Sequence, residues 1–249
     1  MPWLLLFKGD GMENRYMQKI HLRTSDFDTF GRIKPSAVLD LFQEVAGAHA
    51  EELGIGFESL SKNNLLWVIT KVKYEVVGKV PMHQSVTVHT WPKEPSRITF
   101  EREYLVENEK GEVVIRGSSE WVTMHSEKRC IVPVKDIYPL DSFCEDKNFE
   151  GKFTKVPNFE SENVKGSVIP QFCDLDRNGH VNNIKYADFV LNTVDLGKKE
   201  ITFFQADYHR EIKKGMPVDI LAFCDDNEIL AKGIREYGEK MFSCRICLK

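Results

Sequence analysis

The sequence predicts an α+β protein of two similar domains in tandem, each with an antiparallel sheet wrapped around one central helix. A short pattern occurs twice, as DFDTFGRI at 26–33 and as DLDRNGHV at 174–181. Each copy precedes an apolar helix-like segment, and strand-like segments follow each helix. A length of 249 residues also suits two domains of ordinary size.

In the first copy, a helix is expected over Pro35–Leu53. Its apolar residues cover most of the circumference, which is typical of a buried helix, and Gly54 is suited to end it. Apolar segments bounded by turn residues then indicate strands. These are Leu65–Val77, Gln84–Trp91, Arg97–Glu107 and Glu112–His125.

The second copy repeats this order, with a helix expected over Asn183–Val194. Its expected strands are Glu200–Arg210, Pro217–Cys224, Glu228–Tyr237 and Lys240–Leu248. Between the copies, residues 141–165 are polar and charged, which indicates a surface linker. We therefore expect an N-terminal domain at 13–140 and a C-terminal domain at 166–249.

The N-terminal residues 1–12 are expected to be a disordered or misassigned extension, with Met12 as a natural start. The apolar run Trp3–Phe7 is shorter than a signal-peptide core or a membrane span. We therefore expect no membrane insertion. The net charge of −4 is spread without any basic block, which argues against a nucleic-acid partner.

The six cysteines show no disulfide spacing. Cys244 and Cys247 form a CxxC, but they lie on an expected strand. Residues three apart on a strand point to opposite faces, so joint metal ligation is disfavoured. These cysteines indicate structural thiols, with Cys173 and Cys224 expected as small buried hydrophobes, and a reducing, cytoplasmic setting.

The densest polar cluster is the segment 174–183, DLDRNGHVNN. Its opening matches a calcium-binding loop, but the twelfth position, which should be a glutamate ligand, is Lys185. We therefore expect no metal there. A turn followed by a helix N-cap at Asn182 or Asn183 explains part of the cluster.

The first copy serves as a control for the second. Both copies keep two aspartates and a glycine, so these residues indicate a shared turn. The first copy has Phe30 and Arg32 where the second has Asn178 and His180. Asn178 and His180 are therefore the candidates for chemistry.

The pattern D-x-N-x-H-V-N-N-x-x-Y resembles the signature of the acyl-acyl carrier protein (acyl-ACP) thioesterases of plant plastids and bacteria. Its positions are filled by Asp176, Asn178, His180, Val181, Asn182, Asn183 and Tyr186. The family's second element, E-Y-R-R-E-C, corresponds to the segment 207–212, DYHREI. The family cysteine is thus Ile212 here, which rules out a cysteine nucleophile at that position.

The resemblance implies a tandem hotdog fold with a catalytic C-terminal domain and an N-terminal domain that binds the acyl chain. It implies a catalytic set of Asp176, Asn178, His180 and Glu211, and substrate contacts from Asn182, Asn183, Tyr186 and Trp67. The implied partner is acyl carrier protein with its phosphopantetheine-linked fatty acyl chain. No cofactor is expected, and a homodimer is one assembly open to the chain.

Thioester hydrolysis needs a nucleophile, a base and a donor for the oxyanion. Glu211 could activate water or attack the carbonyl itself, Asn178 and His180 are the donors, and Asp176 is expected to orient the His180 ring. An acyl-coenzyme A thioesterase and a non-catalytic acyl-thioester binding protein remain alternatives. In the first domain, Val77 stands opposite Glu211, and the long helix is expected to line an acyl tunnel through Ala46 and Ala48.

Overall fold

The computed structural model describes residues 14–133, 137, 143–161 and 163–249. The predicted extension at 1–12 lies outside these residues. The first half contains β1 (Tyr16–His21), α1 (Pro35–Glu52), α2 (Phe57–Ser61), β2 (Leu65–Val76), β3 (Ser85–Pro92), β4 (Phe100–Glu107), β5 (Val113–His125) and β6 (Ile131–Val132). The second half contains β7 (Val164–Val168), α3 (Lys185–Leu191), β8 (Ile201–Tyr208), β9 (Val218–Cys224), β10 (Glu228–Ile234) and β11 (Lys240–Leu248).

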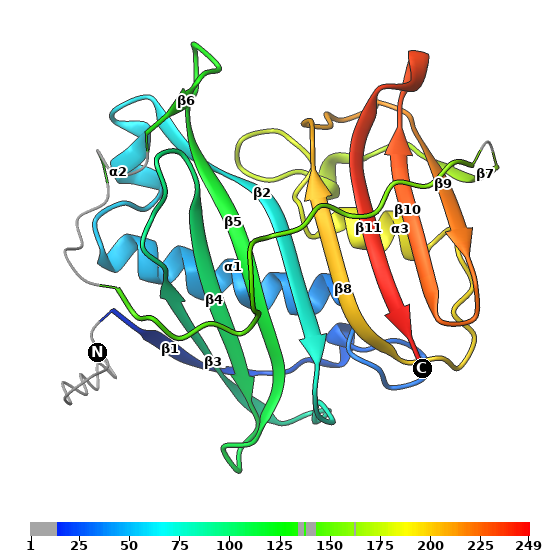
Figure 1. The fold of residues 1–249 in the computed structure, drawn as a ribbon, viewed down its shortest axis with the longest axis horizontal. Helices are drawn as coiled ribbons and strands as arrows, with labels where there is room; N and C mark the ends of the chain where they lie inside the picture. The colour runs from blue at the N-terminus through cyan, green and yellow to red at the C-terminus, as the bar shows by residue number, and fades with distance from the viewer. Residues whose placement is uncertain (1–13, 134–136, 138–142, 162) are drawn as a thin grey trace.

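The described strands form one antiparallel sheet in the order β1-β3-β4-β5-β2-β8-β11-β10-β9-β7, with β6 paired to β5. The order in the second half mirrors that in the first, and the halves meet where β2 pairs with β8. Tyr74 and Phe204 stack across this junction with ring centroids 5.5 Å apart. The helices lie together on one face of the sheet (Figure 1). The tandem arrangement of two hotdog halves, each a sheet against a helix, is confirmed.

Helix α1 forms where it was expected and for the expected reasons. Pro35 occupies its first turn, where the missing N–H costs nothing. At its end, Gly54 has a φ of +71°, and the bonds from Gly54 N to Glu51 O and from Ile55 N to Ala50 O complete a Schellman motif. The helix packs closely on the sheet, since a Cβ at Gly117 would lie 2.3 Å from the Phe42 ring.

Helix α3 is shorter than predicted, covering Lys185–Leu191 rather than Asn183–Val194. Before the helix, the Asn182 side chain accepts a hydrogen bond from Ile184 N at 3.2 Å and forms a turn. After it, the Thr193 hydroxyl donates to Val190 O at 2.8 Å. Asn and Thr side chains that bond to the local backbone compete with the helix, which explains its early end.

Strands β1 and β7 and helix α2 were not predicted, and β10 is shorter than expected. β1 and β7 are the edge strands of the sheet, and their polar residues weaken the strand pattern. β10 ends at Ile234 because the chain enters a 3₁₀ turn at Glu236–Gly238, where Tyr237 has a φ of +62°. In β11, Cys244 is buried and Cys247 half-buried, and all six cysteines are free.

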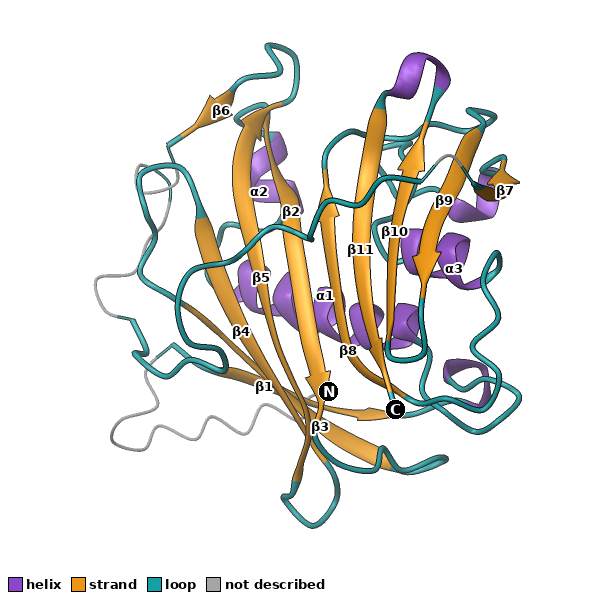
Figure 2. Cartoon of the chain, turned by 45° about the vertical axis from the view of Figure 1, so that its right-hand side comes forward, coloured by secondary structure: helices purple, strands orange, loops and turns teal. Residues whose placement is uncertain are grey.

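The segment between the halves crosses the face of the sheet opposite the helices (Figure 2). It is fixed to the first half by the bond from Asn148 N to the buried Glu103 carboxylate, at 3.0 Å. It is fixed to the second half by the bond from Val156 N to the buried Asp207 carboxylate, at 2.8 Å. Strand β7 begins inside the predicted linker, and the domain boundaries stay predictions. No helix in the described part of the chain is long and apolar enough to cross a membrane.

Candidate active site

The two copies of the repeated pattern fold into the same turn. Asp28 Oδ1 accepts hydrogen bonds from Phe30 N at 2.9 Å and Arg32 N at 3.0 Å. In the same way, Asp176 Oδ1 accepts from Asn178 N at 2.8 Å and His180 N at 3.1 Å.

The glycine and the first aspartate of each pattern are also used alike. Gly31 and Gly179 have φ values of +76° and +78°, which only glycine adopts without cost. Asp26 accepts from Arg23 N and Asp174 accepts from Gln171 N, at 2.7 and 2.8 Å. The prediction that the shared residues serve turn geometry is confirmed.

The second copy differs because its turn brings His180 to Glu211. His180 Nε2 lies 3.3 Å from Glu211 Oε2. The backbone holds the two segments in register, since Val181 N donates to Ile212 O at 2.8 Å and His180 pairs with Lys213. Ile212 is fully buried in the core, so the position of the family cysteine carries an apolar side chain that solvent does not reach.

Asp176 and Asn178 are joined to this pair through the loop. Besides the two backbone N–H groups, Asp176 is contacted by the Asn178 side-chain amide, 3.5 Å from Oδ2. These described contacts place the carboxylate under the backbone of His180 and not against its ring. The expectation that Asp176 orients the imidazole therefore stays a prediction, and the contacts described for Asp176 reach His180 through the backbone of the loop. Asn178 itself is exposed.

Tyr186 and Asn183 of the signature both contact Tyr208 of β8. Tyr186 is buried, and burial raises its pKa well above the usual value, with Glu211 and Asp176 adding to the shift. Its ring packs edge-on against Tyr208 at 5.3 Å, and the Tyr208 hydroxyl donates to Asn183 O at 3.2 Å. Tyr186 is thus a neutral phenol near both carboxylates.

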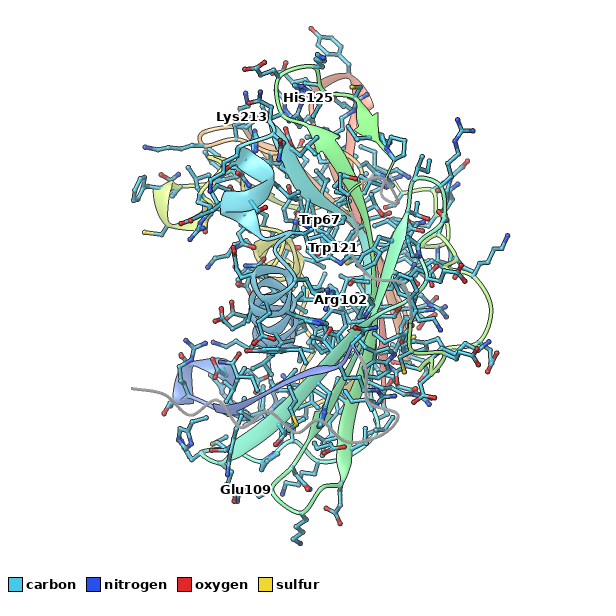
Figure 3. The ribbon with its side chains drawn as sticks, turned by 90° about the vertical axis from the view of Figure 1, so that its left-hand side faces the viewer. Trp67, Arg102, Glu109, Trp121, His125 and Lys213 are labelled. Atoms are coloured by element: carbon cyan, nitrogen blue, oxygen red, sulfur yellow. The ribbon has the colours of Figure 1, made fainter. Side chains whose placement is uncertain are left out.

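Trp67 belongs to the first half and makes its contacts there. Its indole N–H donates to Ile55 O at 3.0 Å, and its ring lies 5.6 Å from that of Phe100. Figure 3 shows Trp67 and Trp121 near the middle of the molecule, below the end where His125 and Lys213 lie. Within the described residues, the contacts of Trp67 are with Ile55 and Phe100 of the first half, so its role in substrate binding stays a prediction.

A small cavity lies between the first half and Asn183, Ile184 and Tyr208 of the second. It has a volume of about 20 Å³ and lies between α1 and the sheet. Its walls are Leu39, Phe42, Gln43, Ile69, Val72, Tyr104, Ser119, Trp121, Asn183, Ile184 and Tyr208. Ala46 and Ala48 do not line this cavity, so their place in an acyl tunnel stays a prediction.

The site also contains a residue that sequence reasoning missed. Arg129 lies in the turn after β5, and its guanidinium contacts Glu211 Oε2. Nearby, Arg177 of the His180 loop lies over the ring of Phe57 in α2, 4.7 Å from its centroid. The site is thus assembled from both halves, and Arg129 was missed because it is distant in sequence and belongs to no motif.

A larger groove lies at the first copy of the turn. It has a volume of about 1880 Å³ and is lined by Phe30, Arg32, Val77 and Met82, among others. There Arg32 pairs with Asp28 at 2.6 Å and donates to the carbonyls of Gly197 and Lys199 in the second half. This groove has no His–Glu pair among its described lining residues. Within the described residues, no group of three or more His, Cys, Asp or Glu side chains is placed to hold a metal ion.

Comparison with known proteins follows the same division of the chain. The family model for the N-terminal domain of acyl-ACP thioesterases matches residues 13–139, and that for the C-terminal domain matches 159–244. An oleoyl-ACP thioesterase of Arabidopsis thaliana, described as chloroplastic, is 28% identical over 242 residues, which are 87% of this chain and 65% of the relative. A chloroplastic acyl-ACP hydrolase of Cuphea viscosissima is 25% identical over 241 residues, 89% of this chain and 57% of the relative.

Solved structures agree on the fold. An acyl-ACP thioesterase from Bacteroides thetaiotaomicron superposes with a TM-score of 0.83 at 20% identity, covering 94% of this chain and 98% of that one. A 12:0-ACP thioesterase from Umbellularia californica gives 0.80 at 21% identity, with coverages of 94% and 97%. At these identities the match concerns the fold alone, and the chain spans about three-fifths of the length of the curated relatives.

Proposed function

The chain belongs to the acyl-ACP thioesterase family, and from its site we propose that it hydrolyses the thioester of fatty acyl-ACP. The products are a free fatty acid of fatty acid biosynthesis and the carrier thiol. The observation that carries the proposal is the 3.3 Å contact between His180 Nε2 and Glu211 Oε2. Both residues occupy the family's motif positions, and a small cavity lined mainly by apolar residues reaches Asn183 of the same signature.

Two routes of attack fit this geometry. In the first, Glu211 takes a proton from water while the water oxygen bonds to the thioester carbon. Donors from Asn178 and His180 then stabilise the oxyanion, each contributing about 3–4 kcal/mol. As the C–S bond breaks, its electron pair leaves with sulfur, and the proton passes from Glu211 to the thiolate.

In the second route, a Glu211 oxygen attacks the carbon and expels the thiol, leaving a mixed anhydride. Water then hydrolyses the anhydride and restores the carboxylate. Neither route uses a cysteine, which agrees with the buried Ile212 at the family's cysteine position.

The first half is proposed to bind the acyl chain, while the second carries the catalytic residues. The cavity beside α1 is lined by Leu39, Ile69 and Val72 and reaches Asn183, just before α3 of the catalytic half. Each methylene buried there contributes about 0.8 kcal/mol. Since the cavity holds only about 20 Å³, the acyl chain has to displace side chains that line it.

Acyl carrier protein is the proposed partner, and the charge around the site supports an anionic one. Arg177, Lys213 and Lys214 are exposed on the loops that form the site. Cations at the rim of a site attract acidic partners and phosphate groups. A cytoplasmic location is proposed from the six free cysteines, and a homodimer stays a prediction.

The test is a substrate comparison with purified protein. Acyl-ACP and acyl-coenzyme A of graded chain length are offered at equal concentrations, and thiol release is followed. We expect hydrolysis with a higher kcat/KM on the carrier protein. A higher kcat/KM on coenzyme A would reassign the substrate, and binding without thiol release would reassign the chain as a binding protein.

A further inference from the structure

The Glu211 carboxylate is held at one oxygen by groups from both halves of the molecule. His180 Nε2 contacts Oε2 from the second half, and Arg129 contacts the same Oε2 from the first. The described contacts of the carboxylate therefore leave Oε1 as the oxygen that can meet water or the thioester carbon. Arg129 donates a hydrogen bond to Oε2, and a charge-assisted bond of this kind restricts the orientation of a carboxylate.

The turn that carries Arg129 is shaped to present it. Arg129 has a φ of +53°, and non-glycine residues in the left-handed region cost energy and cluster at functional sites. Three hydrogen bonds fix the turn: Arg129 N to His125 O at 2.9 Å, His125 N to Cys130 O at 2.9 Å, and Lys128 N to the His125 ring at 3.3 Å. These hydrogen bonds hold the turn in its strained conformation, so the Arg129 side chain is positioned before a substrate binds.

We propose that Arg129 is a positioning residue for hydrolysis, which fixes Glu211 across the domain junction so that Oε1 faces the thioester. The inference rests on the proposed function and adds to it a residue from the half that carries none of the signature. Because Arg129 fixes a catalytic group and does not touch the reacting atoms, its loss acts on kcat. It also makes catalysis depend on contact between the halves.

The rival role for Arg129 is docking. Its side chain is 47% exposed, and an exposed arginine near a site could bind the phosphate of the phosphopantetheine arm or an acidic carrier surface. The two roles differ on a small substrate. An acyl-N-acetylcysteamine thioester has neither phosphate nor carrier protein, so docking contributes nothing to its turnover, whereas positioning of Glu211 still does.

The experiment therefore measures kcat and KM of Arg129→Met on acyl-ACP and on the small thioester. We expect kcat to fall about tenfold to a hundredfold on both, the size of a small misplacement of a catalytic group, with KM unchanged. Arg129→Lys should restore part of the rate. Lys128→Met removes a neighbouring exposed charge and is the matched control, expected to leave the small thioester rate unchanged.

A double variant shows whether Arg129 acts through Glu211. Adding Arg129→Met to Glu211→Gln should cause no further loss of the residual rate. An independent further loss, or a loss confined to acyl-ACP and to KM, would overturn the proposal, as would an unchanged kcat in Arg129→Met. Thermal unfolding confirms that the variants are folded, and an inactive wild-type protein would instead reject the proposed function.

Discussion

The two copies of the Asp-x-Asp turn have the same backbone and different uses. In each, an aspartate receives the same two backbone N–H groups, and a glycine adopts a left-handed conformation. In the first copy the turn ends in Arg32, which binds Asp28 and two carbonyls of the second half. In the second it ends in His180, which meets Glu211.

The comparison distinguishes residues with a structural role from residues with a catalytic one. Each turn lies at the junction of the halves and reaches across it, through Arg32 in one case and through Glu211 and Arg129 in the other. At the first junction, Arg32 donates to two carbonyl oxygens of the second half, so its role is structural. The second leaves a carboxylate and an imidazole side by side and partly exposed, which suits proton transfer.

The largest effect is expected from removing His180 or Glu211, the pair that only the second copy has. Glu211→Ala or His180→Ala should lower turnover of acyl-ACP by about a hundredfold or more, the usual effect of losing an acid–base group. Thiol release with purified variants measures this, and circular dichroism checks their folding. Near-normal rates in both variants would remove these residues from the mechanism.

Next in size is the effect of removing the shared aspartate from each copy. Asp28→Ala and Asp176→Ala each leave backbone N–H groups without their charged acceptor, so each should cost about 1–3 kcal/mol in the free energy of unfolding. Turnover should fall about tenfold or more only in Asp176→Ala, because only that loop carries a catalytic residue. Urea unfolding and thiol release give the two readings. An equal loss of activity in both variants would contradict the division between scaffold and chemistry.

The parts of this molecule that could be predicted are those that depend on local sequence patterns. The tandem repeat, the long helix α1 and the core strands follow from apolar periodicity, and the repeat itself separated the turn residues from His180. The edge strands β1 and β7 could not be predicted, because their pairing depends on β3 and β9 and not on their own polar sequences.

The site shows the same limit. His180 and Glu211 were predicted as members of one catalytic set through a family motif, and the structure places them 3.3 Å apart. Arg129 is 82 residues away from Glu211 in sequence, so only the pairing of β2 with β5 and β8 brings them together. Ala46 and Ala48 do not line the cavity beside α1, and an apolar helix with no polar face does not reveal which side borders a cavity.

A smaller effect concerns the acyl chain, which only the first half is proposed to bind. Val72→Phe fills the cavity beside α1, whereas Val45→Phe enlarges an equally buried valine that does not line it. We expect Val72→Phe to shift the preference toward shorter chains, with each lost methylene contact costing about 0.8 kcal/mol, or about fourfold in kcat/KM. Assays over a series of acyl lengths measure this. The same loss at every length would mean that the first half is only a scaffold.

The smallest effect is expected from the cysteines. Ile212 stands at the family's cysteine position and is fully buried, while burial raises the pKa of Cys244 to about 12 and keeps it a thiol at neutral pH. Cys173 and Cys224 are exposed, so the expectation that they are buried hydrophobes is wrong, and alkylating reagents will reach them. Because neither contacts the His180–Glu211 pair in the described structure, Cys173→Ala and Cys224→Ala should keep wild-type turnover, and so should the alkylated protein. Thiol release cannot be read in the presence of the reagent, so fatty acid release is the measurement. If a folded Cys173→Ala or Cys224→Ala variant were inactive, attack by water or by Glu211 would have to give way to a thiol mechanism.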